Sequence, residues 1–197
     1  MSEKSTAEKI VDEARRLIMA RGYNGFSYAD IAAAVGIRKA SIHHHFAAKS
    51  DLAKAVIAQS RAGIHAVAER LQDGEPSAGD ELRAYTDYWK RCIADNSAPF
   101  CVAGMLAAEL PSLPDDVAGE VRAHFTDLAD WLERVLALGA RQKSVKLAGS
   151  PRDEAAAFMA SVYGAMLSAR AFGDPGRYAS VTEALLSRIV RLDQPQG

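Results

Sequence analysis

The chain has 197 residues, of which 49% are hydrophobic and 25% are charged, and this composition excludes a disordered or fibrous protein. Two cysteines are too few for a disulfide framework or for a four-thiolate zinc site. The 24 basic and 25 acidic side chains give a net charge of -1, which taken alone argues against a nucleic-acid-binding protein.

The charge is unevenly distributed along the chain. Residues 1–60 contain 9 basic and 6 acidic side chains, whereas the other 137 residues contain 15 basic and 19 acidic ones. This asymmetry predicts a small domain with an anionic partner, joined to a larger acidic domain. We place the first domain at residues 1–48 and the second at residues 49–197.

The start of the sequence and its apolar runs bear on the location of the protein. The first ten residues lack the apolar core of a secretory signal. No run reaches about 18 consecutive apolar residues, the length that a membrane-spanning helix needs. We therefore expect a cytoplasmic protein that does not enter a membrane.

Two helices and their limits are predicted near the N-terminus, and the second of them is short. Ser5 and Ser27 each precede an acidic residue by three positions, which is the spacing of a capping box at a helix start. Apolar residues with helical spacing follow each serine, and Gly22 and Gly36 are expected to end the two helices.

A third short helix is predicted within residues 38–46. Ile42 and Phe46 are four positions apart and can both point inward. The side chains left to face outward are mostly polar or basic: Arg38, Lys39, Ser41, His43 and His44.

The rest of the chain also has helical periodicity, and no segment alternates as a strand does. Glycine, proline and polar clusters separate the apolar segments, and residues 192–197 are expected to fray. The expected fold is therefore all-α with about nine helices. The later helices are expected at 49–72, at 82–93, between Pro99 and Leu110, from 117 until fraying by Gly149, at 151–172 and at 175–190.

Two short helices joined by a glycine-containing turn, the second one basic outside, have the form of a helix-turn-helix. The stretch FSYADIAAAVGIRKASIHHHFAAKSDLAKAV resembles the DNA-binding signature of TetR-family transcriptional repressors, and the likeness extends over residues 10–56. His43 departs from the pattern, because the family usually has tyrosine there. The positions that match are Ile31, Ala32, Gly36, Ile37, Ser41, Ile42, His45, Phe46, Lys49 and Leu52.

The resemblance implies double-stranded DNA as a partner, read by the third helix in the major groove. Lys39 is the candidate for base readout, and Ala40 allows close approach or touches a thymine methyl group. Arg38 reaches either a base or a phosphate, and His43 can donate to either. Candidates for phosphate contacts are Ser27, Tyr28, Ser41, His44 and Lys49.

A structural alternative is a three-helix cap whose charged face is only solvated. The three histidines at 43–45 do not indicate a metal site, because consecutive helical residues diverge by about 100° each. We expect His45 to pack or to form hydrogen bonds within the helix-turn-helix, and we expect no cofactor.

The resemblance also implies that the last two helices form a homodimer interface, so that the protein reads a palindromic operator. Small residues on these helices, such as Gly164 and Ala165, allow close helix approach, and Val181 and Leu185 belong to an apolar stripe. The alternative is that both helices only complete the core of the monomer.

A small-molecule effector of unknown identity is expected to bind between the fourth and eighth helices and to lower DNA affinity. Aromatic residues at helical spacing are also typical of an ordinary core, so that alternative stays open. The candidate pocket residues are Tyr85, Tyr88, Trp89, Phe100, Cys101, Met105, Glu109, His124, Phe125, Trp131, Phe158, Met159 and Tyr163.

Cys101 suggests a second kind of signal. It lies at the expected start of a helix, where the dipole can lower a thiol pKa, so a repressor that senses oxidants or electrophiles is an alternative to one with a reversible ligand. A buried structural cysteine is the simpler interpretation. An enzyme is not expected, because the sequence has no nucleophile elbow and no phosphate-binding glycine loop. A helical adaptor that binds protein remains a third hypothesis.

Overall fold

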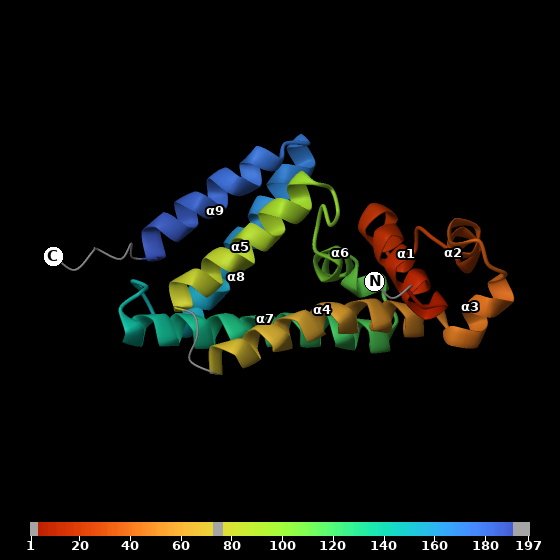
Figure 1. The fold of residues 1–197 in the computed structure, drawn as a ribbon, viewed down its shortest axis with the longest axis horizontal. Helices are drawn as coiled ribbons and strands as arrows, with labels where there is room; N and C mark the ends of the chain where they lie inside the picture. Colours follow the sequence, from red (N-terminus) through yellow and green to blue (C-terminus); the bar gives the residue numbers. More distant parts are fainter. Residues whose placement is uncertain (1–3, 73–76, 191–197) are drawn as a thin grey trace. The chain divides into compact units, whose positions relative to one another are not determined.

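The computed structural model describes residues 4–72 and 77–190, which form nine α-helices and one 3₁₀ turn without a β-strand (Figure 1). This confirms the all-α prediction. The elements are α1 (Thr6–Arg21), α2 (Tyr28–Val35), α3 (Lys39–His45), α4 (Lys49–Gln72), α5 (Ala78–Ala94), α6 (Val102–Ala108), η1 (Leu110–Ser112), α7 (Asp115–Gln142), α8 (Pro151–Phe172) and α9 (Pro175–Ile189).

The chain divides into two compact units. Residues 1–63 and 101–125 form one, here called the N-terminal unit, and residues 64–100 and 126–197 form the other, the C-terminal unit. Helices α4 and α7 contribute residues to both. Helix α6 thus belongs to the same compact unit as α1, α2 and α3. The functional boundary after residue 48 stays a prediction.

Capping hydrogen bonds stabilise the first turns of α1 and α2, as predicted. The Ser5 side chain accepts the Glu8 N–H, while the Glu8 carboxylate accepts the Ser5 N–H at 2.7 Å. Ser27 and Asp30 repeat this capping box, also with a 2.7 Å bond from the Ser27 N–H to the carboxylate. These reciprocal bonds satisfy amide donors that a helix start leaves unpaired.

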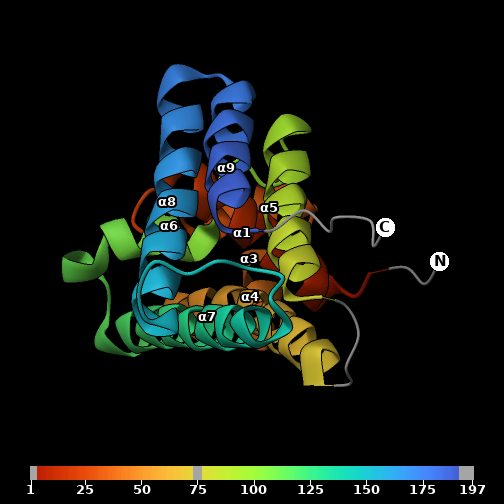
Figure 2. The same cartoon turned by 90° about the vertical axis from the view of Figure 1, so that its left-hand side faces the viewer.

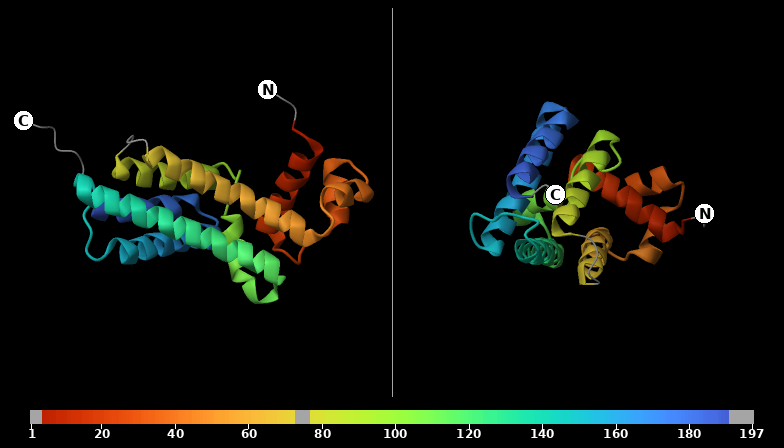
Figure 3. Two further views of the ribbon diagram at one scale, coloured as in Figure 1. Left: turned by 90° about the horizontal axis from the view of Figure 1, so that it is seen from below. Right: turned by 60° about the vertical axis from the view of Figure 1, so that its left-hand side comes forward.

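Apolar side chains of α1, α2 and α3 form the core of the helix-turn-helix. Ile10, Ile18, Ile31 and Ile42 are each 0% exposed. Helix α1 packs against α2, α3 and α6, and Figure 3 shows the first three helices beside one another in red and orange. The spacing of these isoleucines on short helices therefore brings α3 to the surface with only one side buried.

In the C-terminal unit, α8 packs on α9 and α9 packs on α5, and Figure 2 shows the three side by side. The fully buried Tyr178 hydroxyl of α9 donates to the Thr86 carbonyl of α5 at 3.2 Å. Burial raises the pKa of Tyr178, so this hydroxyl stays a donor at ordinary pH.

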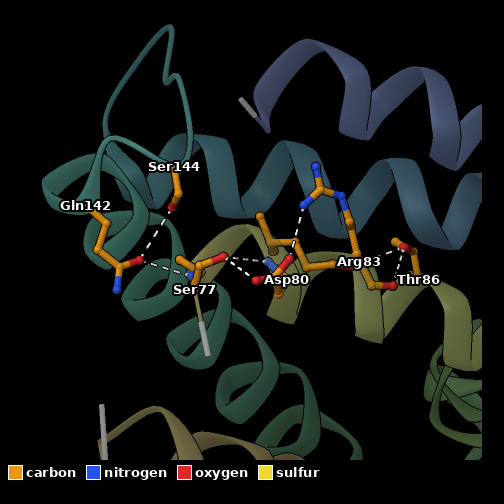
Figure 4. A network of polar contacts seen from close by, with 8 residues as sticks. Ser77, Asp80, Arg83, Thr86, Gln142 and Ser144 are labelled. Atoms are coloured by element: carbon orange, nitrogen blue, oxygen red, sulfur yellow. Dashed lines mark hydrogen bonds and ion pairs between the residues drawn. The ribbon is translucent and has the colours of Figure 1, made fainter. Parts of the chain in front are cut away.

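A polar network secures the start of α5 against the end of α7 (Figure 4). The Ser77 side chain accepts the Asp80 N–H at 3.2 Å, and its hydroxyl donates to the Asp80 carboxylate at 2.6 Å. The Gln142 side-chain oxygen accepts the Ala78 N–H at 3.0 Å and a bond from the Ser144 hydroxyl at 3.4 Å. The first amides of α5 therefore have partners from both helices.

One predicted helix end was misplaced. Helix α7 ends at Gln142 and does not continue toward Gly149, because Lys143 has a φ of 60° and the Ser144 N–H turns back to the Gly139 carbonyl at 2.9 Å. Val145 then pairs with Val190 in an isolated antiparallel bridge. Helix α6 ends at Ala108, close to the predicted stop near Leu110, and the 3₁₀ turn η1 follows it. The expected fraying of residues 192–197 lies outside the described part of the chain.

Among the described helices, α8 is long and apolar enough to cross a membrane by length and composition, with 33% of its apolar window buried. Its stretch without charged side chains, residues 155–169, is bounded by Glu154 and Arg170 and is shorter than the run of about 18 residues expected of a membrane-spanning segment. A core or interface helix of a water-soluble protein meets the same criteria.

Gly22 and Gly36, the C-cap residues of α1 and α2, provide a test of the contact with Glu109. Both have a φ of +74°, but ψ is -179° at Gly22 and 34° at Gly36; in addition, a Cβ at Gly22 would overlap the Glu109 carboxylate, whereas a Cβ at Gly36 would meet nothing within 4 Å. We expect Gly36→Ala to cost about 1–2 kcal/mol for its left-handed backbone. Gly22→Ala should cost roughly 3–5 kcal/mol, because backbone strain and the displaced carboxylate add. Urea denaturation of the two variants measures the difference, and equal losses would contradict a close contact with Glu109.

Candidate nucleic-acid interface

Helix α3 presents a basic and small-residue face to solvent. Lys39 is its first residue, and Arg38 precedes it as an N-cap with extended backbone. Arg38, Lys39, Ala40, His43 and His44 are exposed. The side chains of Arg38 and Lys39 form no hydrogen bond or ion pair with any residue that the structure describes. Their cationic groups are therefore available to an anionic partner.

An open hollow of about 530 Å³ adjoins this face, and Thr6 of α1 forms its far side. His45 is exposed in this hollow, and its ring lies 5.5 Å from that of His44. The expectation that His45 packs within the helix-turn-helix was wrong, because only Ile42 of this seven-residue helix is buried. The residues that line the hollow are Thr6, Ile37, Arg38, Ala40, Ser41, His44 and His45.

Lys49, a predicted phosphate contact, has partners inside the protein. Its ammonium group donates to the Phe26 carbonyl and lies over the rings of Tyr23 and Phe26, at 4.8 and 4.2 Å from their centroids. Burial lowers the pKa of Lys49, while the carboxylates of Asp30 and Glu109 act to raise it. In this arrangement the cation connects the start of α4 to the loop before α2.

Tyr28 and Ser27 also use their polar atoms internally. The Tyr28 hydroxyl donates to the Phe46 carbonyl at 3.0 Å, its ring lies 4.8 Å from the His43 ring, and burial raises the pKa of Tyr28 to about 12. The Ser27 hydroxyl donates to Asp30 at 2.6 Å, and this bond lowers the pKa of Asp30. Both residues hold α2 and α3 in place, so a phosphate contact from either would be additional to these bonds.

Glu109, a predicted pocket residue, contacts the helix-turn-helix. Its carboxylate accepts the Tyr23 N–H at 2.9 Å and lies directly against Gly22. The two bonded groups are 86 positions apart in sequence. No local pattern indicates such a pair, and only the packing of α6 on α1 brings them together.

The other candidate pocket residues fall in both units. Cys101, Met105, His124 and Phe125 belong to the N-terminal unit with Glu109, and the remaining candidates belong to the C-terminal unit. Three groups of rings are in contact: His124 with Phe125, Tyr88 with Trp89, and Tyr85 with both Trp131 and Phe158. Phe100 lies under the Arg170 guanidinium, whereas Met159 and Tyr163 are half-buried.

Cys101 lies at the N-cap of α6, as its position after Pro99 suggested, but its side chain caps no amide and the residue is 2% exposed. An electrophile or oxidant reacts with an accessible thiolate. The burial therefore favours a packing role for Cys101 over a sensor role.

Comparison with known proteins identifies the family to which this fold belongs. Residues 10–56 match the family model described as bacterial regulatory proteins, tetR family, and residues 78–185 match the tetracyclin repressor-like C-terminal domain. The chain belongs to the TetR family. Members of this family are DNA-binding transcription regulators and not enzymes.

Solved structures and a curated relative agree with this assignment. A TetR-family regulator from Agrobacterium tumefaciens is 49% identical, with a TM-score of 0.88, over 94% of this chain and 97% of its own. A TetR regulator from Legionella pneumophila is 30% identical, with a TM-score of 0.83, over 95% and 98%. The repressor DhaR of Mycobacterium sp. strain GP1 is 23% identical over 168 residues, which are 85% of this chain and 83% of DhaR. This TetR-family chain is accordingly a DNA-binding transcription regulator.

The internal partners of Lys49 lead to a test that separates a structural role from DNA contact. Lys49→Met keeps the side-chain length but removes the cation, and should lower the free energy of unfolding by about 1–2 kcal/mol through the lost bond to Phe26 and the lost ring contacts. Lys39→Met, at an exposed lysine whose side chain has no partner in the described part of the chain, is the matched control and should change stability by less than about 0.5 kcal/mol. Chemical denaturation measures both. An unchanged stability of Lys49→Met, together with a weaker salt dependence of DNA binding, would show instead that Lys49 contacts phosphate.

Proposed function

We propose that this chain is an effector-responsive repressor that binds a palindromic operator as a homodimer and is released by a small molecule. The observation that carries the proposal is the face of α3, where Arg38 and Lys39 are exposed and have no partner in the described part of the chain. Cationic donors at the start of a recognition helix are the groups that read guanine edges and phosphates in the major groove. The bacterial cytoplasm is the proposed location.

Individual roles follow from exposure. Lys39 reads a base edge, and Ala40 leaves room for a base or touches a thymine methyl group. Arg38 contacts a base or a phosphate, and His43 donates to the backbone or to a base acceptor. Ser41 and His44 remain the proposed phosphate contacts; His44 is exposed, whereas Ser41 is half-buried and presents only part of its surface. Lys49, Tyr28 and Ser27 stabilise the positions of the helices through their bonds inside the protein.

The proposed dimer interface is the outer face of α8 and α9. Leu167, Phe172 and Val181 are 60%, 65% and 41% exposed, which is unusual for large apolar side chains. A Cβ at Gly164, one turn before Leu167, would meet no atom within 4 Å, so a helix of a second copy has room to approach. A two-fold dimer presents two α3 helices to successive major grooves about 34 Å apart, and this matches a palindromic operator.

Release by an effector needs a physical connection to the helix-turn-helix. Support comes from the Glu109 carboxylate, because it bonds the end of α6 to the Tyr23 N–H. The regulator AibR, 22% identical over 93% of this chain and 97% of its own with a TM-score of 0.69, was solved with isovaleryl coenzyme A and operator DNA. The shared fold is therefore able to hold both kinds of partner. An effector acts when it binds one arrangement of the dimer more tightly than the other.

Operator binding tests the roles of the two free cations. With the duplex that flanks the gene, Lys39→Ala should reduce the preference over a random duplex of equal length by roughly 5- to 150-fold, because base discrimination is lost. If Arg38 contacts a phosphate, Arg38→Ala should weaken binding to both duplexes and lower the slope of log affinity against log salt by about 1. Fluorescence anisotropy across a salt series measures both quantities.

Arg91→Ala is the matched control, because Arg91 is an exposed cation on α5, outside the helix-turn-helix. Its affinity and salt slope should equal those of the unmodified protein. If the unmodified protein showed no preference for the flanking duplex over random DNA, the operator proposal would be abandoned.

Leu167→Glu tests the proposed interface. The two-fold axis places the new carboxylate in the interface twice, and burial of an unpaired charge should weaken dimerisation by roughly 100-fold or more. Tyr88→Glu is the control, since Tyr88 is 49% exposed but lies on α5. Sedimentation equilibrium should find monomers for Leu167→Glu and dimers for Tyr88→Glu. A dimeric Leu167→Glu protein would place the interface elsewhere.

A further inference from the structure

The exposed surface of α3 has two sides, and only one of them borders the hollow beside α1. On the side toward α2, the His43 ring lies 4.8 Å from the Tyr28 ring, and its Nδ1 atom donates to the Ala47 carbonyl at 3.3 Å. His43 does not line the hollow, whereas His44 and His45 do. The side chains of His44 and His45 form no hydrogen bond or ion pair with any described residue, so their ring nitrogens are open to a ligand.

Every polar side chain that lines the hollow is able to donate a hydrogen bond, and none of them is acidic. Thr6 and Ser41 provide hydroxyl groups, and Arg38 provides a guanidinium group. The two imidazoles of His44 and His45 complete the polar lining. An open hollow with one permanent cation, several donors and no carboxylate among its described residues is suited to an anionic oxygen.

The charged and titratable groups on the two helices that pack against α3 have partners of their own. At the start of α1, Lys4 pairs with Asp12 at 2.7 Å, and the Glu8 carboxylate accepts its capping bond at 2.7 Å. On α2, the Asp30 carboxylate caps its own helix. Burial raises the pKa of Tyr28 to about 12, so this residue keeps its proton at ordinary pH. The charge of the hollow therefore depends on its lining residues.

The positions of His44 and His45 indicate the shape of the ligand. Consecutive residues of a helix diverge by about 100°, so the two rings do not converge on one small ion. Their centroids are 5.5 Å apart, with an angle of 69° between the rings. A DNA backbone that passes through the hollow presents a row of phosphate oxygens, and each ring then meets a different one. This spacing favours a phosphodiester backbone over a free phosphate ion.

We infer that the hollow beside α3 binds the phosphate backbone of the operator through His44 and His45, and that both imidazoles take up a proton on binding. An imidazole changes its charge between about pH 5 and 8, and only its charged form provides a counter-charge to phosphate. DNA affinity is thereby linked to pH. This inference rests on the proposed function, to which it adds His45 as a contact and pH as a second signal.

The sign of the pH dependence follows from linkage. A phosphate stabilises the charged imidazole, so the complex keeps each proton to a higher pH than the free protein does. The added affinity is fully present at the acidic end of the range, where the imidazoles are charged in both states. It is lost as the pH rises until the imidazoles in the complex are neutral as well.

The experiment measures the affinity of the full-length protein for the flanking duplex and for a random duplex, over a pH series at constant ionic strength. From about pH 8 to about pH 6 the affinity for both should rise roughly 10- to 100-fold, because phosphate contacts do not depend on sequence. His44→Gln and His45→Gln keep a hydrogen-bond donor that does not titrate. Each should remove about half of the rise in log affinity, and the double variant should remove nearly all of it.

His65→Gln is the matched control, because His65 lies in α4 beyond the helix-turn-helix. It should keep the full pH dependence. His44 and His45 are exposed, so their variants should unfold at the same urea concentration as the unmodified protein. A pH dependence that survives in the double variant would overturn the inference, as would an affinity that stays constant across the pH series.

Inorganic phosphate distinguishes a free anion from the DNA backbone. At about 10 mM and constant ionic strength it should change duplex affinity by less than roughly twofold, since one ion does not contact both rings. Saturable competition by phosphate that His44→Gln abolishes would assign the hollow to a free phosphate and overturn its assignment to DNA.

The two duplexes distinguish this inference from the proposed repressor. Preference for the flanking duplex with an affinity that ignores pH would refute the role of the histidines and leave the repressor intact. Equal affinity for both duplexes that rises as the pH falls would support the histidines and refute the operator proposal. Absence of binding to either duplex would refute both.

Discussion

The loop between α1 and α2 depends on two side chains from outside the helix-turn-helix. The Glu109 carboxylate accepts the Tyr23 N–H, and the Lys49 ammonium donates to the Phe26 carbonyl. Without these partners, two partly buried backbone groups would lack hydrogen bonds, which folded proteins avoid. The loop determines where α2 begins, and α2 packs on α3. The position of the exposed face of α3 therefore depends on the start of α4 and the end of α6.

The basic side chains of the N-terminal unit divide into those that pair with carboxylates and those that are exposed to solvent. Lys54 with Asp116 and Arg61 with Glu120 pair across the N-terminal unit, at 2.8 and 2.7 Å. Cations of this kind contribute little to the field that a DNA phosphate meets. Arg38 and Lys39 are exposed without such partners in the described part of the chain, so a nearly neutral protein still presents a concentrated positive face. Its total charge of -1 is therefore a poor guide to its partner.

The elements of the fold that depend on bonds between residues close in sequence were predictable. The capping boxes at Ser5 and Ser27 and the glycine ends of α1 and α2 were correct, because each depends on bonds between residues at most four positions apart. The end of α7 was misplaced, because the residue with the left-handed backbone that ends the helix is Lys143 and not a glycine. Long-range bonds were missed for a different reason. The partner of Glu109 is 86 residues away, and a carboxylate among apolar residues is equally typical of a pocket.

The sequence by itself determined that this protein is all-helical, that a helix-turn-helix occupies its start and that Lys39 and its neighbours face outward. Helical periodicity and capping are local, so they require no knowledge of the other helices. Only the tertiary structure decided which polar groups have interaction partners inside the protein. It gave internal partners to Lys49 and Tyr28, joined Glu109 to the helix-turn-helix and left the indoles of Trp89 and Trp131 without acceptors among the described residues. Whether a buried group is satisfied depends on atoms that the fold brings from distant positions, and no spacing along one helix records them.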